Sequence, residues 1–295
     1  MSRARLRMVV VVPFLNEQRH LPVLLESLAG QDRAPDYLLL VDDGSRDRSA
    51  DIARRFAEQH RWARVLQRPQ RRTERDRMAR AHEWRAFAWG LAQAAVAWDV
   101  AAKLDADLRL APGLLAEMER RFLAEPRLGM AGPRLSRAVL DGRLEPQRCA
   151  PGHVEGPTRF YRRECLEAIS PVPPILGWDT IDEVRARLRG WETRTYPVDG
   201  HVVHLRRVGS YDGVLRGYRR AGWAAFAYGA HPLHLLASAA VRLGDRPPVA
   251  CGVAYLGGYV AAAVRGEPRA EADVRLRVRT EQRARLSAIA RGRAA

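Results

Sequence analysis

The chain of 295 residues contains little lysine and little cysteine, and each shortage narrows what the protein can be. Lys103 is the one lysine, so arginine supplies nearly all of the 50 basic residues and of the formal net charge of +16. Coding composition or selection for anion binding can produce this bias, and either way the surface attracts phosphates, anionic lipids or nucleic acids. Three cysteines (Cys149, Cys165 and Cys251) lie far apart, which argues against a disulfide framework or a zinc site.

Long hydrophobic runs are also missing. No segment reaches the roughly 18 uncharged residues typical of a membrane-spanning helix. The apolar run near the N-terminus is interrupted by Pro13 and Asn16, too early for a signal peptide. We therefore expect a cytoplasmic protein. A hydrophobic fraction of 47% indicates an ordinary folded chain, long enough for one large domain or for a domain with an appendage.

Strand-like apolar runs alternate with helix-like spacing along the first half of the chain. The predicted strands cover residues 6–14, 37–41, 63–67 and 100–104, and the predicted helices cover 21–30, 49–59, 85–97 and about 112–123. This alternation predicts an α/β fold, a Rossmann-like and mostly parallel sheet flanked by helices. Near residue 211 the composition changes toward alanine, glycine and aromatic residues, so we expect a helical, arginine-rich C-terminal extension over 211–295.

Two aspartates follow the fourth predicted strand. In Asp105-Ala106-Asp107 the carboxylates are one residue apart at the carboxyl end of the strand, where open α/β sheets bind their ligands. Mg²⁺ and Mn²⁺ bind few protein carboxylates together with phosphate oxygens. D-x-D is common in solvated turns, so its place after a strand is what favours a site for metal and diphosphate.

Asp42 and Asp43 stand in the same position after the second predicted strand. A carboxylate there can accept hydrogen bonds from a base N–H or from a ribose hydroxyl. The alternative is structural, with Ser45 or Asp47 capping the helix that follows.

Three segments in this order resemble the motifs of glycosyltransferase family 2. They are Val9-Val10-Val11-Val12-Pro13-Phe14-Leu15-Asn16-Glu17, Val41-Asp42-Asp43-Gly44-Ser45-Arg46-Asp47 and Leu104-Asp105-Ala106-Asp107. The resemblance implies the GT-A fold and an inverting transfer from a nucleoside-diphosphate sugar that depends on Mg²⁺ or Mn²⁺. It further implies a nucleoside pocket, a ribose or metal contact from Asp105 and a metal ligand in Asp107. The residues implied to line the nucleoside pocket are Pro13, Asn16, Glu17, Asp42 and Asp43.

A base for the acceptor hydroxyl is expected in a later acidic segment. Gly177-Trp178-Asp179-Thr180-Ile181-Asp182-Glu183, with Gly190-Trp191 after it, resembles the G-E-D segment of the family. Matching without gaps places Asp179 on the family's catalytic aspartate and Trp178 on its usual glutamate. Asp182 or Glu183 is the alternative base. The structural alternative is a helix N-terminus that carries acids.

His204 and Arg206 lie in a segment that resembles a His-x-Arg element of some family members. The resemblance implies that His204 completes the metal site and that Arg206 pairs with the diphosphate. A structural histidine is the alternative. The Q-x-x-R-W element of processive synthases is missing, so we expect transfer of a single sugar.

The apolar segments 232–241 and 249–264 allow three interpretations. They can lie in a membrane interface with nearby arginines on anionic headgroups, pack as buried helices, or span a bilayer, for which about sixteen residues is short. We adopt the first, which predicts peripheral attachment to the cytoplasmic face of a membrane and a lipid-linked or cell-envelope acceptor. The arginines concerned are Arg242, Arg246, Arg265 and Arg269.

Two other functions compete with sugar transfer. A nucleotidyltransferase would carry a glycine- and arginine-rich loop after the first strand, where this chain has Pro13-Phe14-Leu15-Asn16-Glu17. A nucleic-acid-binding protein would suit the charge of +16 but not acids at strand ends. We therefore predict a glycosyltransferase for a UDP- or GDP-sugar and a hydroxyl acceptor. Its catalytic domain would cover 1–210, with a nucleotide-sugar-binding half (1–110) and an acceptor half (111–210).

Overall fold

The computed structural model describes residues 5–69, 80–138, 143–147, 152–206 and 213–292. The chain divides into two compact units, the first made of residues 1–75, 82–170 and 189–206 and the second of 76–81, 171–188 and 207–295. The predicted boundary near residue 210 falls outside the described residues, as does Cys149. Cys165 and Cys251 are both buried.

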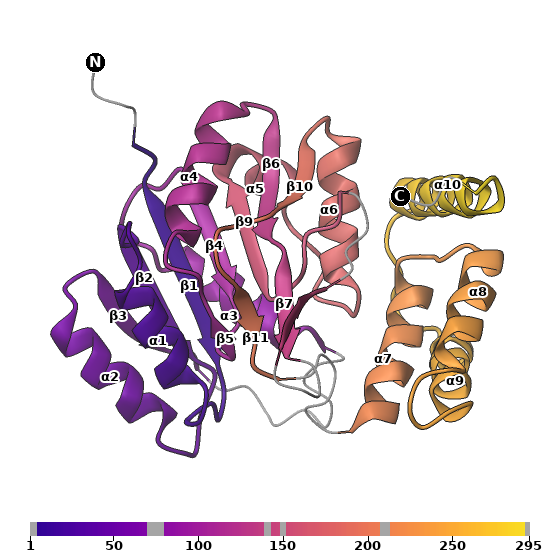
Figure 1. Ribbon diagram of the computed structural model, residues 1–295, viewed down its shortest axis with the longest axis horizontal. Coiled ribbons are helices and arrows are strands. Elements are labelled where there is room, and N and C mark those ends of the chain that lie inside the picture. Colours follow the sequence, from indigo (N-terminus) through magenta and orange to yellow (C-terminus); the bar gives the residue numbers. More distant parts are fainter. Residues whose placement is uncertain (1–4, 70–79, 139–142, 148–151, 207–212, 293–295) are drawn as a thin grey trace. The chain divides into compact units, whose positions relative to one another are not determined.

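A seven-stranded sheet forms the centre of the first unit (Figure 1). Its strands lie in the order β10-β6-β9-β4-β1-β2-β3. They are β1 (Met8–Phe14), β2 (Tyr37–Asp42), β3 (Ala63–Gln67), β4 (Val100–Leu104), β6 (Leu128–Pro133), β9 (Thr158–Arg162) and β10 (Glu192–Tyr196). β9 runs antiparallel to β4 and β6, and the other neighbours pair in parallel. The predicted mostly parallel α/β sheet is confirmed, and the carboxyl ends of β4, β1 and β2 lie side by side.

Helices cover both faces of this sheet because its central strands are apolar on both sides. Val10 and Val12 of β1 face a core shared with α1 (Leu21–Ala29), α2 (Ser49–Gln59) and α4 (Leu114–Ala124). On the other face, α3 (His82–Ala92) approaches so closely that a Cβ on Gly90 would lie 2.5 Å from Val41 Cγ2. α5 (Arg163–Ile169) packs on β6 and β9. The helix predicted over 85–97 is present but runs from His82 to Ala92, because no glycine or proline in the sequence marks its ends.

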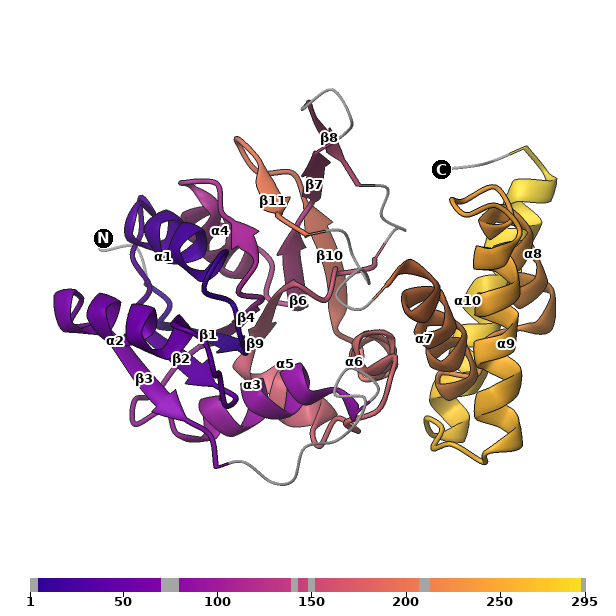
Figure 2. The same cartoon turned by 90° about the horizontal axis from the view of Figure 1, so that it is seen from below.

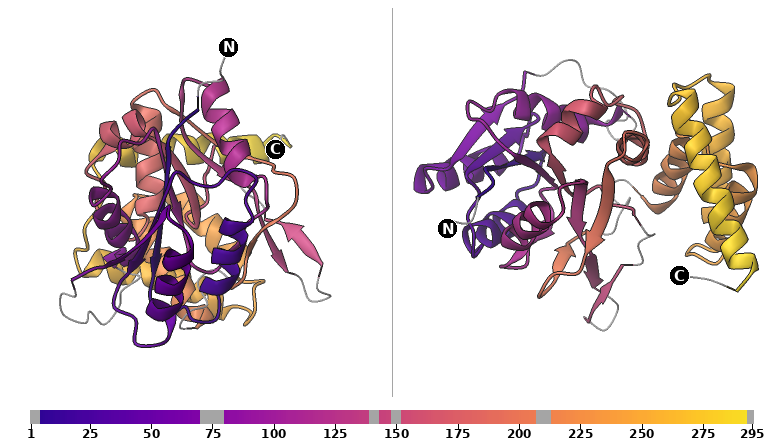
Figure 3. Two further views of the ribbon diagram at one scale, coloured as in Figure 1. Left: turned by 90° about the vertical axis from the view of Figure 1, so that its left-hand side faces the viewer. Right: turned by 90° about the horizontal axis from the view of Figure 1, so that it is seen from above.

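The first unit also contains a second, four-stranded sheet (Figure 2), in which β11, near the end of the unit, pairs with β5 directly after the D-x-D segment. Its order is β5-β11-β7-β8, from β5 (Leu108–Arg109), β11 (Val202–His204), β7 (Leu135–Ala138) and β8 (Leu144–Pro146). β11 is antiparallel to β5, with His204 opposite Leu108. The N–H of Leu205 donates to the carbonyl of Asp107 at 2.9 Å. β7 and β8 extend away from the large sheet (Figure 3).

The second unit is helical and contains α6 (Trp178–Leu188), α7 (Val214–Ala227), α8 (Pro232–Arg242), α9 (Ala250–Val264) and α10 (Ala272–Ala290). α6 and α10 share a small core that includes Ile181, Val184 and Val274. α7 packs on α9, and α8 joins them in a core around Leu235 and Tyr255. The predicted C-terminal helical extension is confirmed. Among the described residues, no helix is both long and apolar enough to cross a membrane.

Candidate functional site

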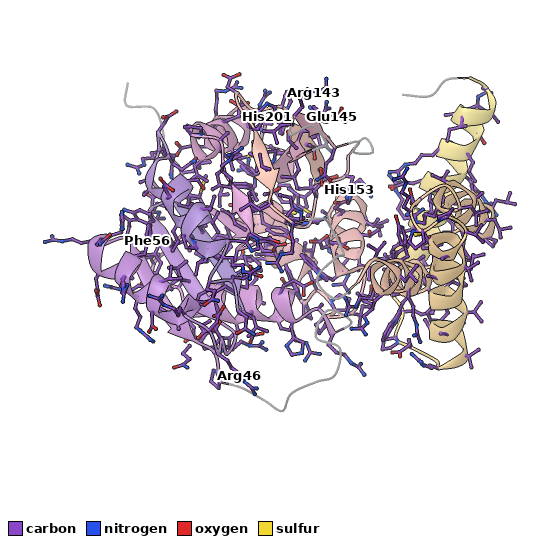
Figure 4. The ribbon with its side chains drawn as sticks, turned by 60° about the horizontal axis from the view of Figure 1, so that its bottom comes forward. Arg46, Phe56, Arg143, Glu145, His153 and His201 are labelled. Carbon is purple, nitrogen blue, oxygen red and sulfur yellow. The ribbon has the colours of Figure 1, made fainter. Side chains whose placement is uncertain are left out.

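The loops after β1 and β2 are bound to each other at the carboxyl edge of the large sheet. The side chain of Asn16, whose φ is +55°, accepts the N–H of Arg46 at 2.8 Å, and the N–H of Asn16 donates to Ser45 Oγ at 3.1 Å. The N–H of Glu17 donates to Ser49 Oγ at 2.7 Å. Figure 4 labels Arg46 in this second loop. Asn16 therefore shapes the two loops through its own hydrogen bonds.

Asp42 and Asp43 have different surroundings although they are adjacent. Asp42 is buried, and its Oδ1 accepts the N–H groups of Gly44 and Ser45 at 3.1 and 2.8 Å, which closes the turn after β2. Asp43 Oδ1 accepts a bond from Arg68 at 2.9 Å, and its Oδ2 lies 3.7 Å from His82 Nδ1. Sequence reasoning missed Arg68, although its place directly after β3, the neighbour of β2, could have revealed it. Pro13 lies buried on β1 beside Val41.

The two aspartates of the D-x-D segment also have separate partners. Asp105 contacts the buried ammonium of Lys103. Asp107 Oδ2 lies 3.2 Å from His204 Nε2 and 3.4 Å from Arg206 Nε. The antiparallel pairing of β5 with β11 is what brings His204 and Arg206 to this carboxylate.

Arg206 connects this cluster to the loop after β1. Its guanidinium contacts Glu17 Oε2 and lies 3.1 Å from His20 Nδ1, and His20 in turn lies 3.1 Å from Glu17 Oε2. Sequence reasoning missed His20, whose spacing of three residues from Glu17 at the start of α1 was the available signal. The structure thus joins Glu17, Asp107, His204 and Arg206, predicted from three separate segments, into one cluster.

Mutual charge sets the protonation of Asp107 and His204. Burial pushes the pKa of Asp107 upward, but the hydrogen bond to His204 and the charges of His204 and Arg206 hold that pKa below its usual value. Burial pushes the pKa of His204 downward, but the hydrogen bond to Asp107 and its charge, with Asp105, raise that pKa above its usual value. Each of the two groups therefore favours the charged form of the other.

Asp107 and His204 fit a divalent cation that is shared with a ligand. Two neighbouring ligands about 2.1 Å from an octahedral ion lie about 3 Å apart, close to the 3.2 Å between Asp107 Oδ2 and His204 Nε2. Within the described part of the chain, no group of three or more His, Cys, Asp or Glu side chains could hold a metal. A cation here would need additional oxygens, and a diphosphate carries them.

The acids predicted to include the base lie on α6, in the second unit. Asp179 stands in the first turn of α6 and is half-buried, whereas Asp182 and Glu183 are buried. Asp182 Oδ1 accepts the N–H of Glu183 at 2.6 Å, and Glu183 lies 3.6 Å from Arg187. Burial, followed by the charges of Tyr255 and Asp179, raises the pKa of Tyr228. Asp179 is therefore the one of these three acids that solvent can reach.

Acidic residues thus follow β1, β2 and β4 at one edge of a mostly parallel sheet, and β11 brings His204 and Arg206 beside the D-x-D segment after β4. The Glycosyl transferase family 2 profile matches residues 9–170, more than half of the chain, and the chain belongs to this family. The protein is thus a glycosyltransferase. None of the curated proteins compared with the chain matches it significantly in sequence.

Solved structures share the fold. The mannosyltransferase PcManGT from Pyrobaculum calidifontis, in complex with GDP-Man and Mn²⁺, is 21% identical with a TM-score of 0.57, over 90% of this chain and 74% of that one. GalNAc-T7 with UDP, GalNAc and Mn²⁺ is 15% identical with a TM-score of 0.56, over 83% of this chain and 52% of that one. TarS 1–349 of S. aureus with UDP-GlcNAc is 16% identical with a TM-score of 0.51, over 86% and 73%. The predicted GT-A fold is confirmed.

Proposed function

We propose that the protein transfers a single sugar, with inversion, from a UDP- or GDP-sugar to a hydroxyl acceptor and uses Mg²⁺ or Mn²⁺. The cluster of Asp107, His204 and Arg206 carries this proposal. Asp107 and His204 are residue types that ligate divalent metals, and the guanidinium of Arg206 beside them is suited to binding phosphate. The GDP-Man and UDP-GlcNAc held by PcManGT and TarS support a nucleotide-sugar donor, and the Mn²⁺ of PcManGT supports a divalent cation.

On the donor side, Asp107 and His204 would hold the cation, which when bound neutralises charge on the departing diphosphate. Arg206, at 3.4 Å from Asp107, exchanges that contact for a phosphate oxygen. Asp43 accepts a hydrogen bond from the base or the ribose, with its orientation held by Arg68. The loops that contain Pro13, Asn16, Glu17 and Asp42 border the nucleoside.

On the acceptor side, Asp179 is the base in this mechanism because, unlike Asp182 and Glu183, it is reached by solvent. Its carboxylate takes the proton of the acceptor hydroxyl as that oxygen attacks the anomeric carbon. The bond from this carbon to the diphosphate oxygen breaks on the opposite face, and the nucleoside diphosphate leaves with the electron pair. One displacement inverts the anomeric configuration.

Peripheral attachment to an anionic membrane and a lipid-linked or cell-envelope acceptor complete the proposal. α9 contains no charged residue, and its exposed side chains include Val253, Val260 and Val264. These three share one helix face because they are seven and four residues apart. Arg246 and Arg265, which flank α9, are exposed and could pair with lipid phosphates.

A thermal-shift panel of UDP-, GDP- and dTDP-sugars, each with and without Mn²⁺, tests the donor. We expect one nucleotide to raise the unfolding temperature, and to raise it further with Mn²⁺. Asp107→Ala should lose the Mn²⁺-dependent part and all transfer, whereas Asp179→Asn should keep donor binding and lose transfer. Full activity of either variant would remove that residue from the mechanism. Steeply salt-dependent binding to random DNA, without any response to nucleotide sugars, would contradict the proposed function.

A further inference from the structure

Three arginines of the second unit gather at the C-terminal end of α7. Arg279 donates from its Nε to the carbonyl of Gly229 at 3.1 Å. The stem of Arg275 passes Gly229 so closely that a Cβ on this glycine would lie 2.7 Å from Arg275 Cγ. The guanidinium carbon of Arg269 lies 4.6 Å from the ring centroid of Phe226. These three residues, Arg269, Arg275 and Arg279, are called the arginine triad below.

Within the described part of the chain, the arginine triad forms no ion pair with a carboxylate. Two glutamates of the same segment bind arginines of α6 instead. Glu271 contacts Arg185, and Glu281 Oε2 lies 2.9 Å from Arg187. Arg275 Nε is buried and has no hydrogen-bond partner among the described residues. The positive charge of the triad is therefore not neutralised by an acid in direct contact with it.

The end of α7 balances only a small part of this charge. A helix C-terminus carries roughly half a negative charge, whereas the triad carries three positive ones, and the carbonyl of Ala227 is already bonded to the N–H of Ala270 at 2.8 Å. Arg275 and Arg279 are four residues apart on α10, a spacing at which like charges destabilise a helix. Partial burial and the charges of these two arginines lower the pKa of Arg269. A bound anion would relieve this repulsion.

We propose that the arginine triad binds a phosphate or diphosphate group, carried by a lipid headgroup or free in solution. A planar guanidinium donates two parallel N–H groups to phosphate oxygens, so three of them around one anion form a specific site. Arg269 and Arg279 are exposed and Arg275 is half-buried, which lets an anion reach them from solvent. The inference goes beyond the proposed function, because the triad shares no residue with the donor cluster and requires no sugar transfer.

Calorimetric titration with inorganic diphosphate in EDTA tests the site. The unchanged protein is compared with a triad variant that combines Arg269→Gln, Arg275→Gln and Arg279→Gln. Glutamine keeps an N–H donor for the carbonyl of Gly229 but carries no charge. The triad variant should bind diphosphate about tenfold or more weakly, the value of a charge-assisted hydrogen bond. Arg269→Gln alone, which removes no hydrogen bond within the described part of the protein, should weaken binding about threefold or more.

The matched control removes the same charge from the first unit. Arg55, Arg61 and Arg64 are exposed residues on and near α2 and β3, and changing all three to glutamine should alter diphosphate affinity by less than about twofold. The thermal shift caused by nucleotide sugars should be the same in the triad variant as in the unchanged protein. A failure of the proposed function, seen in that thermal shift, is thereby distinguished from a failure of this inference.

Vesicles identify the source of the phosphate. The proteins are co-sedimented with vesicles that contain phosphatidic acid, whose phosphate is a terminal monoester, and with pure phosphatidylcholine. Loss of phosphatidic acid binding in the triad variant would assign the site to a lipid headgroup, and a loss confined to diphosphate would assign it to a free anion. If the triad and control variants match each other toward both probes, or if the unchanged protein binds neither, the inference is overturned.

Discussion

At the scale of single residues, arginine also forms the ion pairs that lie inside the fold. Arg33 is the clearest case. Its guanidinium donates to Glu119 Oε2 at 2.9 Å, to Asp36 Oδ2 at 2.8 Å and to the carbonyl of Leu6, and its side chain is 9% exposed. It thereby ties α4 to the segments before β1 and β2. The forked geometry of the guanidinium is what permits three partners at once.

We expect Arg33→Met to lower the free energy of unfolding by about 3 kcal/mol, because Glu119 would remain largely buried without its partner. Arg54→Met is the matched control, since Arg54 pairs with Asp51 on the exposed side of α2 and should change stability by less than about 1 kcal/mol. Urea unfolding of the two variants measures the difference. Equal losses would show that the Arg33 crosslink adds nothing beyond a surface ion pair.

At the scale of elements, the contact between α7 and α9 depends on two glycines. A Cβ on Gly222 would lie 1.8 Å from the carbonyl oxygen of Tyr255, and one on Gly258 would lie 1.9 Å from that of Arg219. The backbones of the two helices therefore touch at this crossing. Figures 1 and 2 show α7 and α9 adjacent in both views.

Gly258→Ala should force α7 and α9 apart and destabilise the second unit by about 2 kcal/mol or more, the usual cost of overpacking. Gly257→Ala offers a control one residue away, because a Cβ on Gly257 meets nothing within 4 Å. That change should raise stability by about 0.5–1 kcal/mol through helix propensity. Thermal unfolding followed by circular dichroism distinguishes the two. A neutral Gly258→Ala would mean that the crossing is not tightly packed.

At the scale of the whole molecule, the charge of +16 and the exposed valines of α9 predict a protein that attaches to anionic membranes. We expect co-sedimentation with vesicles that contain phosphatidylglycerol, and less with pure phosphatidylcholine, because arginines near α9 interact with headgroup phosphate. The triple change of Val253, Val260 and Val264 to serine should reduce binding at least about tenfold, since each valine buries apolar area in the interface.

Leu276→Ser is the control for this experiment. Leu276 is an exposed apolar residue of α10, with 67% of its surface accessible, and it stands in a helix rich in charged residues. Its change should leave vesicle binding within about twofold, because one side chain without apolar neighbours adds little to insertion. If the valine variant binds as tightly as the unchanged protein, attachment by α9 is wrong, and binding by charge alone would show as full release in high salt.

The sequence by itself determined the class of fold and the order of the motifs. An unbroken valine run in β1 requires a strand buried on both faces, and the alternation with α1 and α2 leads to a parallel sheet. The D-x-D segment and the acidic loop after β2 could be recognised without coordinates, because each directly follows an apolar strand segment in the sequence. The ends of α2 were also predicted correctly, but those of α3 were not, because the sequence carries no glycine or proline there to mark them.

Only the tertiary structure decided which charged groups meet. Asp107 pairs with His204 because β11 returns beside β5, a contact between residues about a hundred positions apart that no local pattern encodes. The same holds for Arg206 with Glu17, which are 189 positions apart. Lys103 of β4 lies opposite Arg159 of β9, which the pairing register alone reveals. Local periodicity governs elements, whereas the electrostatics of a site depend on distances that only packing sets.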